Sequence, residues 1–482
     1  MNERVPIGWV RQGRDTRPLR VLASDLTGGP HALVTGRSGS GKSMLVLGLI
    51  LWIYLHRSDV HQVYVDAKGV DSEQLLSWLP GLALRHPDRV TPDSVGVFMP
   101  WSSYGLPLNL LADQPGVDPD LGASVLADIF EVLVGEGLGG RMRPALVATI
   151  PAVKEATRDA TLLDVLRVFE DERFRERLAA RVHSPESRRY LQEVLPSEPR
   201  STTSAITARL RHLLGVRRIR GLLSGSSECI RGADLLGTRL SIVSAGASPT
   251  GHGGQVGKLL GAFLLNLLTS AVFSRTERTP LVIWVDEFQT LTSATSEMDL
   301  EAALQRARAF GTSFGLITQG LGQLRSSTLV ESILTNVSTW CALAPRDELR
   351  HLDRVLPPPT GRVLDPERPG RLLSSDAERR VRLAALGRLG GRAGIWAELS
   401  RGRSSVIERT ANVPIDELDR LAEAAPAELH DAFARGRFGV PIADLIAGAE
   451  RDEPAVDRSV AEPTPVRAPA RRRGRMPLRL PS

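Results

Sequence analysis

The chain has 482 residues, of which 42% are hydrophobic, enough for a large core in about two or three domains, or in one large domain with an insertion. Its two cysteines, Cys229 and Cys341, exclude a disulfide framework and a cysteine-based metal cluster, and they fit a reducing cytosol. The formal net charge is only +6, no apolar run reaches the length of a membrane span and the N-terminus has no signal-peptide pattern, so we expect a cytoplasmic globular protein.

The first distinctive element along the chain is a glycine-rich loop between an apolar strand and an apolar helix. It has the pattern G-x-x-x-x-G-K-S, which a chain with only four lysines would seldom contain by chance. Glycines let such a loop turn tightly and aim backbone N–H groups at phosphate oxygens. Lys42 would reach the β- and γ-phosphates, and Ser43 would ligate Mg²⁺. We therefore expect ATP to bind at Gly36, Arg37, Ser38, Gly39, Ser40, Gly41, Lys42 and Ser43.

Short apolar runs then alternate with helical patterns, which is typical of an α/β fold with a doubly wound, mostly parallel sheet. Several runs end in a polar or charged residue, as expected where ligand chemistry gathers at the carboxyl ends of strands. Two longer apolar stretches, Ser43–Leu55 and Leu259–Phe273, are predicted to be buried helices. The predicted strands are Ala32–Thr35, Val63–Asp66, Val95–Met99, Arg239–Ser244, Leu281–Val285, Ser313–Thr318 and Thr339–Leu343.

The pattern turns helical between residues 112 and 232, which predicts an all-α insertion in the sheet domain. One helix face is expected within residues 121–133, a capping pair of Thr161 and Asp164 begins a second helix, and a third helix runs from about residue 201 or 202 to Leu214. The basic cluster GVRRIRG, residues 215–221, is either a solvated helix end or a DNA contact, and the sequence leaves both interpretations open.

A second motif, PLVIWVDEFQTL, predicts catalytic carboxylates. Leu281–Val285 is apolar on both faces, as in a central strand, and Asp286 and Glu287 follow directly at its end. In a P-loop enzyme, Asp286 would hold the Mg²⁺ shell, through water or through Ser43, and Glu287 would orient and deprotonate the attacking water. The alternative is an acidic pair that only caps a helix.

The order is looser after residue 344. A proline-rich connector is followed by a predicted β-hairpin that turns at Arg401–Arg403 and by a helical segment over about residues 414–448. Residues 465–482 hold six arginines and no acidic residue, so the chain without them is formally neutral. This tail cannot bury enough apolar surface to fold, and it either binds a phosphate backbone or only solubilises the chain.

Two sets of motifs resemble the FtsK–HerA superfamily. The stretch from VPIGWV through DLTGGPHALVTGRSGSGKS to VYVDAKG resembles the FtsK/SpoIIIE motor domain, with matching positions at Pro30, His31, Asp66 and Lys68. The later segments VDEFQTL, ARAFGTSFGLITQG and ILTNVSTWCALAPRDE are similar, in that order, to HerA and to the type IV coupling and conjugation ATPases. The resemblance covers about residues 5–70 and 235–350 and does not select one member of the superfamily.

The resemblance implies a RecA-like ATPase that assembles as a homo-hexameric ring and pumps DNA through a central channel in conjugative or mobile-element transfer. It implies that Gln319 senses the γ-phosphate, with a capping glutamine as the alternative. It also implies that Arg308 is an arginine finger supplied to the ATP of a neighbouring subunit. We expect Arg308 at the edge of the nucleotide face, with Arg306 and Arg346 as rivals and a plain surface arginine as the alternative.

Two other functions stay open at this point. One is a HerA-type translocase that acts with a nuclease in repair or phage defence, and the other is a nucleotide-gated scaffold that assembles without translocating. Several branches of the superfamily carry N-terminal membrane helices. If this protein acts at a membrane, we expect a membrane-pore or relaxase partner to recruit it to the inner face.

The expected organisation has a RecA-like core in two parts, an insertion between them and a small C-terminal α/β extension. The expected boundaries are 1–111 for the first core part with the P-loop, 112–232 for the all-α insertion, 233–350 for the second core part with the acid pair and sensor, 351–450 for the connector, hairpin and helical extension, and 451–482 for a disordered tail.

Overall fold

Nine strands form one sheet at the centre of the molecule, in the order β12-β11-β10-β3-β9-β8-β4-β7-β5. The computed structural model describes residues 4–12, 15–112, 142–157, 159–225, 229–244, 246, 254–291, 294–324, 326–356, 358–359, 363–365, 368, 370–411 and 413–452. The strands from β10 to β5 run parallel, and each predicted strand is present. They are β3 (His31–Gly36), β4 (His61–Asp66), β5 (Val95–Phe98), β7 (Leu240–Ser244), β8 (Leu281–Asp286), β9 (Thr312–Thr318) and β10 (Val337–Leu343).

Strand β8 shows why the middle of this sheet is buried on both faces. Leu281, Ile283 and Val285 pack into one hydrophobic core, whereas Val282 and Trp284 pack into a second core on the other face. Successive side chains of a strand point to opposite faces, so a run that is apolar throughout is stable only between two covering layers. The mostly parallel, doubly wound α/β fold predicted from the sequence is therefore confirmed.

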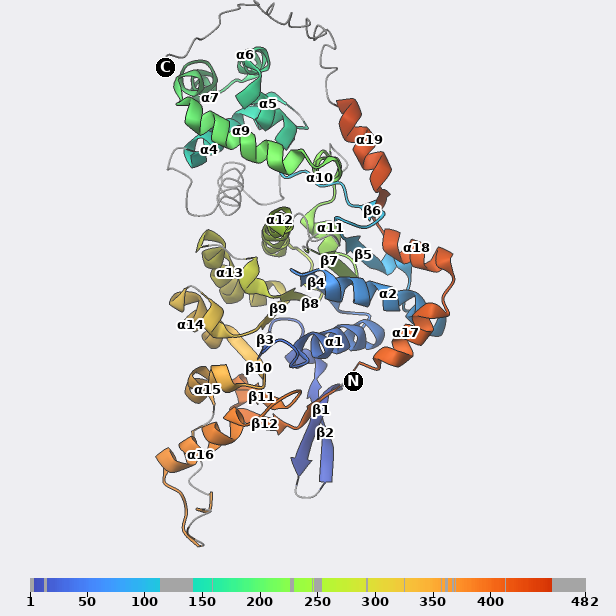
Figure 1. The fold of residues 1–482 in the computed structure, drawn as a ribbon, viewed down its shortest axis with the longest axis vertical. Coiled ribbons are helices and arrows are strands. Elements are labelled where there is room, and N and C mark those ends of the chain that lie inside the picture. The colour runs from blue at the N-terminus through green and yellow to red at the C-terminus, as the bar shows by residue number, and fades with distance from the viewer. Residues whose placement is uncertain are drawn as a thin grey trace, which may run out of the picture.

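Helices supply the two layers (Figure 1). α1 (Lys42–His56) and α2 (Val70–Arg85) contribute to the core on one face, and α12 (Gly254–Phe273) and α13 (Ala294–Arg306) contribute to the core on the other. α1 and α12 confirm the two predicted buried helices. Other elements of this part include α11 (Gly232–Leu236), η5 (Ala307–Phe310), α14 (Ser327–Asn336), η7 (Arg346–Glu348) and α15 (Leu349–Val355).

The predicted helical insertion lies at one end of the molecule, beyond α12 (Figure 1). Its capping pair is confirmed, because the backbone N–H of Thr161 donates to Oδ2 of Asp164 at 2.9 Å. The predicted third helix is α9, and the helix face expected within residues 121–133 lies outside the described residues. The described helices here are α4 (Met142–Ala156), α5 (Leu162–Glu170), α6 (Glu172–Arg181), α7 (Pro185–Arg189), α8 (Leu195–Ser197), α9 (Arg200–Leu214) and α10 (Arg217–Leu223).

The basic cluster of residues 215–221 makes contacts within the chain. Nε of Arg217 lies 2.8 Å from Oε1 of Glu450 in α19 (Ile442–Asp452), and Arg218 donates to the backbone carbonyl of Ser102. These two arginines therefore attach the insertion to the C-terminal helix and to the loop after β5, which neither interpretation of the cluster had anticipated.

The C-terminal extension packs against elements from the first part of the chain. The predicted hairpin is confirmed as β11 (Gly394–Glu398) and β12 (Arg403–Ile407), and β11 pairs antiparallel with β10 at the edge of the main sheet. α17 (Ile415–Glu423) packs on α2, where Nε1 of Trp78 donates to Asp419 at 2.7 Å. The other elements are α16 (Ser375–Gly387), α18 (Ala427–Arg435), β6 (Tyr104–Gly105) and β14 (Val440–Pro441), and a small sheet of β1 (Arg4–Gln12), β2 (Asp15–Leu22) and β13 (Arg409–Thr410).

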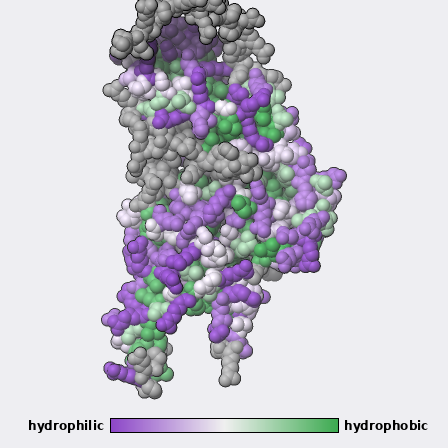
Figure 2. Space-filling view, viewed as in Figure 1, coloured by the Kyte–Doolittle hydropathy of each residue, from purple (hydrophilic) through white to green (hydrophobic). Residues whose placement is uncertain are grey.

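The visible surface is mostly hydrophilic, and hydrophobic residues gather at the lower left of the view, where α15 and α16 lie (Figure 2). Exposed apolar side chains of that region include Val363, Leu364, Leu372 and Val381. Of the helices within the described residues, none is both long and apolar enough to cross a membrane.

Candidate nucleotide-binding site

The P-loop connects the end of β3 to the start of α1. Gly36, Gly39 and Gly41 have φ angles of +156°, +77° and +89°, in the region of backbone space that favours glycine. A Cβ on Gly36 would lie 2.7 Å from the backbone carbonyl oxygen of Leu343, so no larger residue fits there. The first turn of α1 begins at Lys42 and leaves its backbone N–H groups at this end of the helix, where they favour an anion.

Two side chains of the loop are placed to meet phosphate oxygens. Lys42 is buried, its Nζ donates to the carbonyls of Gly36 and Arg37 at 2.6 Å and 3.2 Å, and burial lowers the pKa of its ammonium. Oγ of Ser40 is buried without a hydrogen-bond partner among the described residues. Because an orphaned buried hydroxyl is costly, a phosphate oxygen is a fitting acceptor for it. The loop therefore fits the phosphate chain of a nucleotide.

Asp66, at the end of β4, has a structural role. Its carboxylate accepts hydrogen bonds from the backbone N–H groups of Lys68 and Ser72, both at 2.8 Å, and from the Ser72 hydroxyl at 3.0 Å. These bonds fix the loop between β4 and α2, and they turn that loop so that the Lys68 side chain meets the end of β8.

Asp286 ends β8 beside Asp66 and is nearly inaccessible to solvent. Burial, together with the charges of Asp66, Asp71 and Glu287, raises the pKa of Asp286 to about 7. Asp71, in the first turn of α2, lies near the hydroxyl of Ser43, and burial raises the pKa of Asp71 as well. The cluster of acidic residues around Asp286 therefore has too little positive charge nearby to balance its own negative charge.

Glu287 is held in a left-handed backbone conformation, with φ +47° and ψ +44°. A non-glycine residue in this region costs about 1 kcal/mol or more, and such strain is concentrated at functional sites. The buried carboxylate accepts hydrogen bonds from the Lys68 ammonium and from the amides of Gln289 and Gln319, the last at 2.9 Å. Although burial opposes its charge, these donors hold the pKa of Glu287 below its usual value, so it is a carboxylate at neutral pH.

The residues present fit Mg²⁺. Across the part of the chain that the structure describes, no group of three or more His, Cys, Asp or Glu side chains is arranged to hold a metal ion. Mg²⁺ usually takes only one or two protein ligands and completes its octahedron with water and phosphate oxygens. The Ser43 hydroxyl and the Asp286 carboxylate supply such hard oxygen donors, and a cation would relieve the poorly compensated charge that raises the pKa of Asp286.

Comparison with solved structures identifies the fold. The structure of VirB4 of Thermoanaerobacter pseudethanolicus superposes with a TM-score of 0.55 and 15% sequence identity, over 86% of this chain and 98% of that one. The unbound bacterial conjugative coupling protein TrwBΔN70 superposes with a TM-score of 0.51 and 14% identity, over 80% and 87% of the two chains. TrwB in complex with the GTP analogue GDPNP gives 0.50 and 15%, over 85% and 98%. The chain has the fold of these P-loop ATPases.

No protein-family model matches the sequence, and no curated protein sequence matches it significantly. At 14–15% identity the likeness to VirB4 and TrwB concerns the fold, which is RecA-like as the motifs had implied. What the site does must therefore be argued from its own residues.

Gln319 directly follows β9. β9 separates β3 from β8, and in the β3–β9 register Thr35 pairs with Thr318. The residue after Thr318 therefore emerges between the P-loop and the acid pair, and the hydrogen bond to Glu287 follows from this order of strands.

Arg308 does not lie where it was expected. It is exposed in η5, before β9, and its guanidinium donates to Oγ of Ser338 at 3.1 Å near the amino end of β10. β9 has seven residues, so its two ends are roughly 20 Å apart and Arg308 cannot reach the P-loop of its own subunit. The expected position at the nucleotide face is wrong, because a strand carries its two ends to opposite edges of the sheet. Of the rivals, Arg306 lies over the ring of Phe273, and Arg346 in η7 is at the carboxyl edge.

Three acidic residues at this edge were not predicted from the sequence. Asp71 lies near Ser43, Asp347 forms a two-bond ion pair with Arg37 of the P-loop at 2.8 Å and 2.9 Å, and buried Glu348 accepts a hydrogen bond from the backbone N–H of Leu321 at 2.9 Å. Their only signal in the sequence is that each follows closely on the carboxyl end of a predicted parallel strand.

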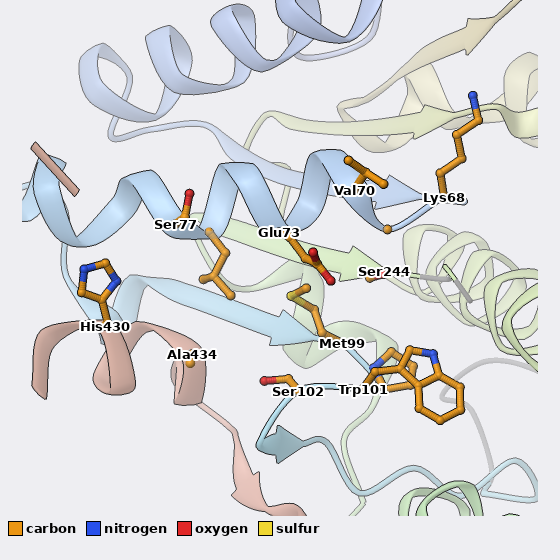
Figure 3. Close-up of a pocket in the computed structure, with 13 residues that line it drawn as sticks. Lys68, Val70, Glu73, Ser77, Met99, Trp101, Ser102, Ser244, His430 and Ala434 are labelled. Atoms are coloured by element: carbon orange, nitrogen blue, oxygen red, sulfur yellow. The ribbon is translucent and has the colours of Figure 1, made fainter. Parts of the chain in front are cut away.

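A hollow of about 750 Å³ adjoins the site on the far side of Lys68, between α2, the end of β5 and α18 (Figure 3). Trp101 and Met99 line it, and Nε1 of Trp101 donates to the carbonyl of Gly246 at 3.1 Å. The Lys68 ammonium points away from Ser77 and His430, which line the other end of the hollow (Figure 3). Lys68 therefore forms the boundary between this hollow and Glu287.

Proposed function

We propose that the protein is an ATP-hydrolysing ring motor that translocates DNA in conjugative or mobile-element transfer. The observation that carries the ATPase part is Glu287, a charged and strained carboxylate held by Lys68 and Gln319 beside the P-loop. This placement is more than a helix cap requires, and it supports the catalytic interpretation of the acid pair.

In this proposal each residue has one task. Lys42 and Ser40 bind phosphate oxygens, and Ser43 and Asp286 hold Mg²⁺, which would neutralise charge that develops on the phosphates. Glu287 orients the attacking water and accepts its proton, for which its lowered pKa keeps it ionised. Gln319 connects the γ-phosphate position to the Glu287 carboxylate, so that the base is oriented when the nucleotide is present.

The proposals that the protein forms a hexamer and that it moves DNA have different support from the proposal of ATP hydrolysis. The fold is shared with the conjugative coupling protein TrwB and with VirB4, and this likeness supports a homo-hexameric DNA motor with a membrane-pore or relaxase partner. Arg308 lies far from its own P-loop, which is consistent with a role at a neighbouring subunit. The arginine-rich tail supplies charge for a phosphate backbone.

The test is ATP turnover without DNA, with single-stranded DNA and with duplex DNA, combined with displacement of streptavidin from a biotinylated DNA end. We expect DNA to stimulate ATP turnover and ATP to drive streptavidin displacement. In the Glu287→Gln variant we expect neither stimulated turnover nor displacement. Turnover without any response to DNA would contradict the motor, and ATP binding without turnover would indicate a scaffold. Neighbouring genes for a relaxase and pilus would favour transfer, whereas a nuclease gene would favour repair or defence.

A further inference from the structure

A groove of about 490 Å³ lies beside the first turn of α1, on the side of the P-loop away from the acid pair. Its walls come from three segments that are far apart in the sequence: α1, the loop before β11, and the segment that runs from Val413 into α17. Its lining includes Met44, Arg392, Val413, Pro414, Asp416 and Arg420.

The groove begins where the phosphate-binding loop ends. Met44 directly follows Ser43, and the Cγ of Arg392 lies 3.3 Å from the position that a Cβ on Gly41 would take. Arg392 therefore packs against the last turn of the P-loop, and the groove directly adjoins the loop.

The sheet order assigns a direction to a nucleotide on this loop. On one side of β3 lie β9 and β8, which carry Gln319 and Glu287, and this is the side of the γ-phosphate in the proposed function. On the other side lie β10 and β11, and Arg392 immediately precedes β11. The opposite end of the nucleotide, its nucleoside, points to this second side. The hollow beside Lys68 lies beyond Glu287, on the first side, and is excluded as the nucleoside site.

The chemistry of the walls suits a nucleoside. Met44, Val413 and Pro414 give an apolar wall, and the exposed Arg392 and Arg420 give planar cationic groups, which stack on aromatic rings. The exposed carboxylate of Asp416 can accept a hydrogen bond from a ribose hydroxyl. Ile415 and Glu417 complete the lining, in which apolar and charged side chains are equally represented, so the groove offers both a surface for a base and hydrogen-bonding groups for a ribose.

We propose that this groove holds the nucleoside of the bound nucleoside triphosphate, with the guanidinium of Arg392 stacked on the base. The inference rests on the proposed ATPase function and deepens it, because it assigns substrate selection to the C-terminal extension. The P-loop binds any triphosphate chain, and Arg392 makes the protein prefer a chain that carries a base.

The experiment is calorimetric titration of the full chain with Mg–ATP and, separately, with inorganic tripolyphosphate. We expect the wild-type protein to bind ATP more tightly, and Arg392→Ala to weaken ATP binding about tenfold while the affinity for tripolyphosphate stays unchanged. Arg392→Lys should lose most of the same preference, since lysine keeps the charge and lacks the plane. Arg420→Ala tests the opposite wall, Arg388→Ala on the same exposed loop is the matched control, and Lys42→Ala should weaken both ligands.

An equal loss of affinity for both ligands in Arg392→Ala would overturn the inference, because Arg392 would then act on the phosphates. Unchanged ATP affinity in Arg392→Ala would overturn it as well, whatever the effect of Arg420→Ala. Failure of the proposed function gives a different result: a wild-type protein that prefers ATP over tripolyphosphate but does not hydrolyse it retains the groove and loses the ATPase.

Discussion

The side-chain amide of Gln319 donates a hydrogen bond of 2.9 Å to Oε1 of Glu287, the same oxygen that the Lys68 ammonium contacts. The two donors come from opposite sides, since Gln319 follows β9 and Lys68 follows β4. The carboxylate is therefore oriented by two strand ends at once, and a ligand that moves either of them moves the base.

Substitutions of Lys42 and of Glu287 should affect different steps, namely ATP binding and ATP hydrolysis. Lys42→Ala should abolish ATP binding, because it removes the cation that meets the phosphates. Glu287→Gln should retain binding and reduce turnover by ~10²–10⁴, the usual cost of a lost general base. Equilibrium binding and steady-state hydrolysis measure the two effects, with Glu277→Gln on an exposed loop as the control. Wild-type turnover in Glu287→Gln would remove the residue from the mechanism.

Lys68→Met should lower turnover while leaving nucleotide affinity intact, since the ammonium orients Glu287 and does not reach the P-loop. Misplacement of a catalytic group of this kind costs about 10²-fold. Without Lys68 the pKa of Glu287 should rise, so activity should be lost at a higher pH when the solution is acidified. The pH–rate profiles of wild type and variant make the comparison, and Lys154→Met is the matched control. A slower enzyme with an unshifted acidic limb would show that Lys68 has only a structural role.

The sequence was sufficient for those parts of the site whose chemistry lies in consecutive residues. The P-loop and the acid pair are continuous motifs, and the central strands are apolar runs that need no knowledge of their neighbours. Asp71 and Asp347 could not be found in this way, because each is a single acidic residue whose role depends on closeness to Ser43 or Arg37 in the folded chain. Contacts of this kind are fixed by strand order.

The sequence did not predict where Arg308 and the C-terminal hairpin lie in the fold, and the reason is the same for both. Each position depends on how the strands are arranged in the sheet. The spacing between Arg308 and Gln319 is known from the sequence, but the intervening strand carries the two residues to opposite edges. The hairpin was recognised from its turn at Arg401–Arg403, yet its pairing with β10 joins residues more than 50 positions apart, and no local pattern specifies that partner.

His31 should make folding stability depend on pH. Its Nδ1 accepts from the N–H of Phe314 at 2.9 Å and its Nε2 donates to the carbonyl of Leu304 at 2.7 Å, so a second proton would meet another donor. Burial, chiefly, lowers the pKa of His31 from 6.5 to about 4. Because the unfolded chain takes up this proton first, the stabilisation is complete above pH 6.5 and is lost as the pH falls towards 4.

Over that range the loss amounts to roughly 3 kcal/mol. Urea unfolding at pH values between 7.5 and 4.5 measures it, with His31→Gln as the variant that does not titrate. The difference in unfolding free energy between the two proteins should shrink as the pH falls. A difference that stays constant across the range would mean that the buried imidazole takes up no proton there.

Arg308 should act between subunits. Arg308→Ala should reduce turnover by ~10³–10⁵ if its guanidinium serves as the finger for a neighbouring ATP. A mixture of Arg308→Ala and Glu287→Gln subunits should regain part of the activity, because some interfaces then combine an intact Glu287 with an intact Arg308. Arg306→Ala is the matched control and should remain active, since Arg306 lies over Phe273 of its own subunit. An active Arg308→Ala protein, or a mixture without recovery, would exclude the role.

Deletion of residues 465–482 should weaken DNA binding and reduce its salt dependence. Six arginines on duplex DNA can contribute up to about −5 to the slope of log affinity against log salt concentration. Fluorescence anisotropy of labelled duplex DNA at several salt concentrations gives the slope for both proteins. Equal slopes would mean that the tail does not contact DNA and serves solubility instead.

The return of the C-terminal extension to the first half of the molecule has a consequence for how the protein is made. β13, which pairs with β1, and α17, which covers α2, lie far downstream of the P-loop in the chain, so a ribosome synthesises them long after it. Until they arrive, the nascent chain has an open strand edge and an uncovered helix face, the features that promote misassembly. A message interrupted between β12 and β13 would therefore encode the P-loop and the acid pair and still lack elements that pack against them, so the fragment should not be a working ATPase.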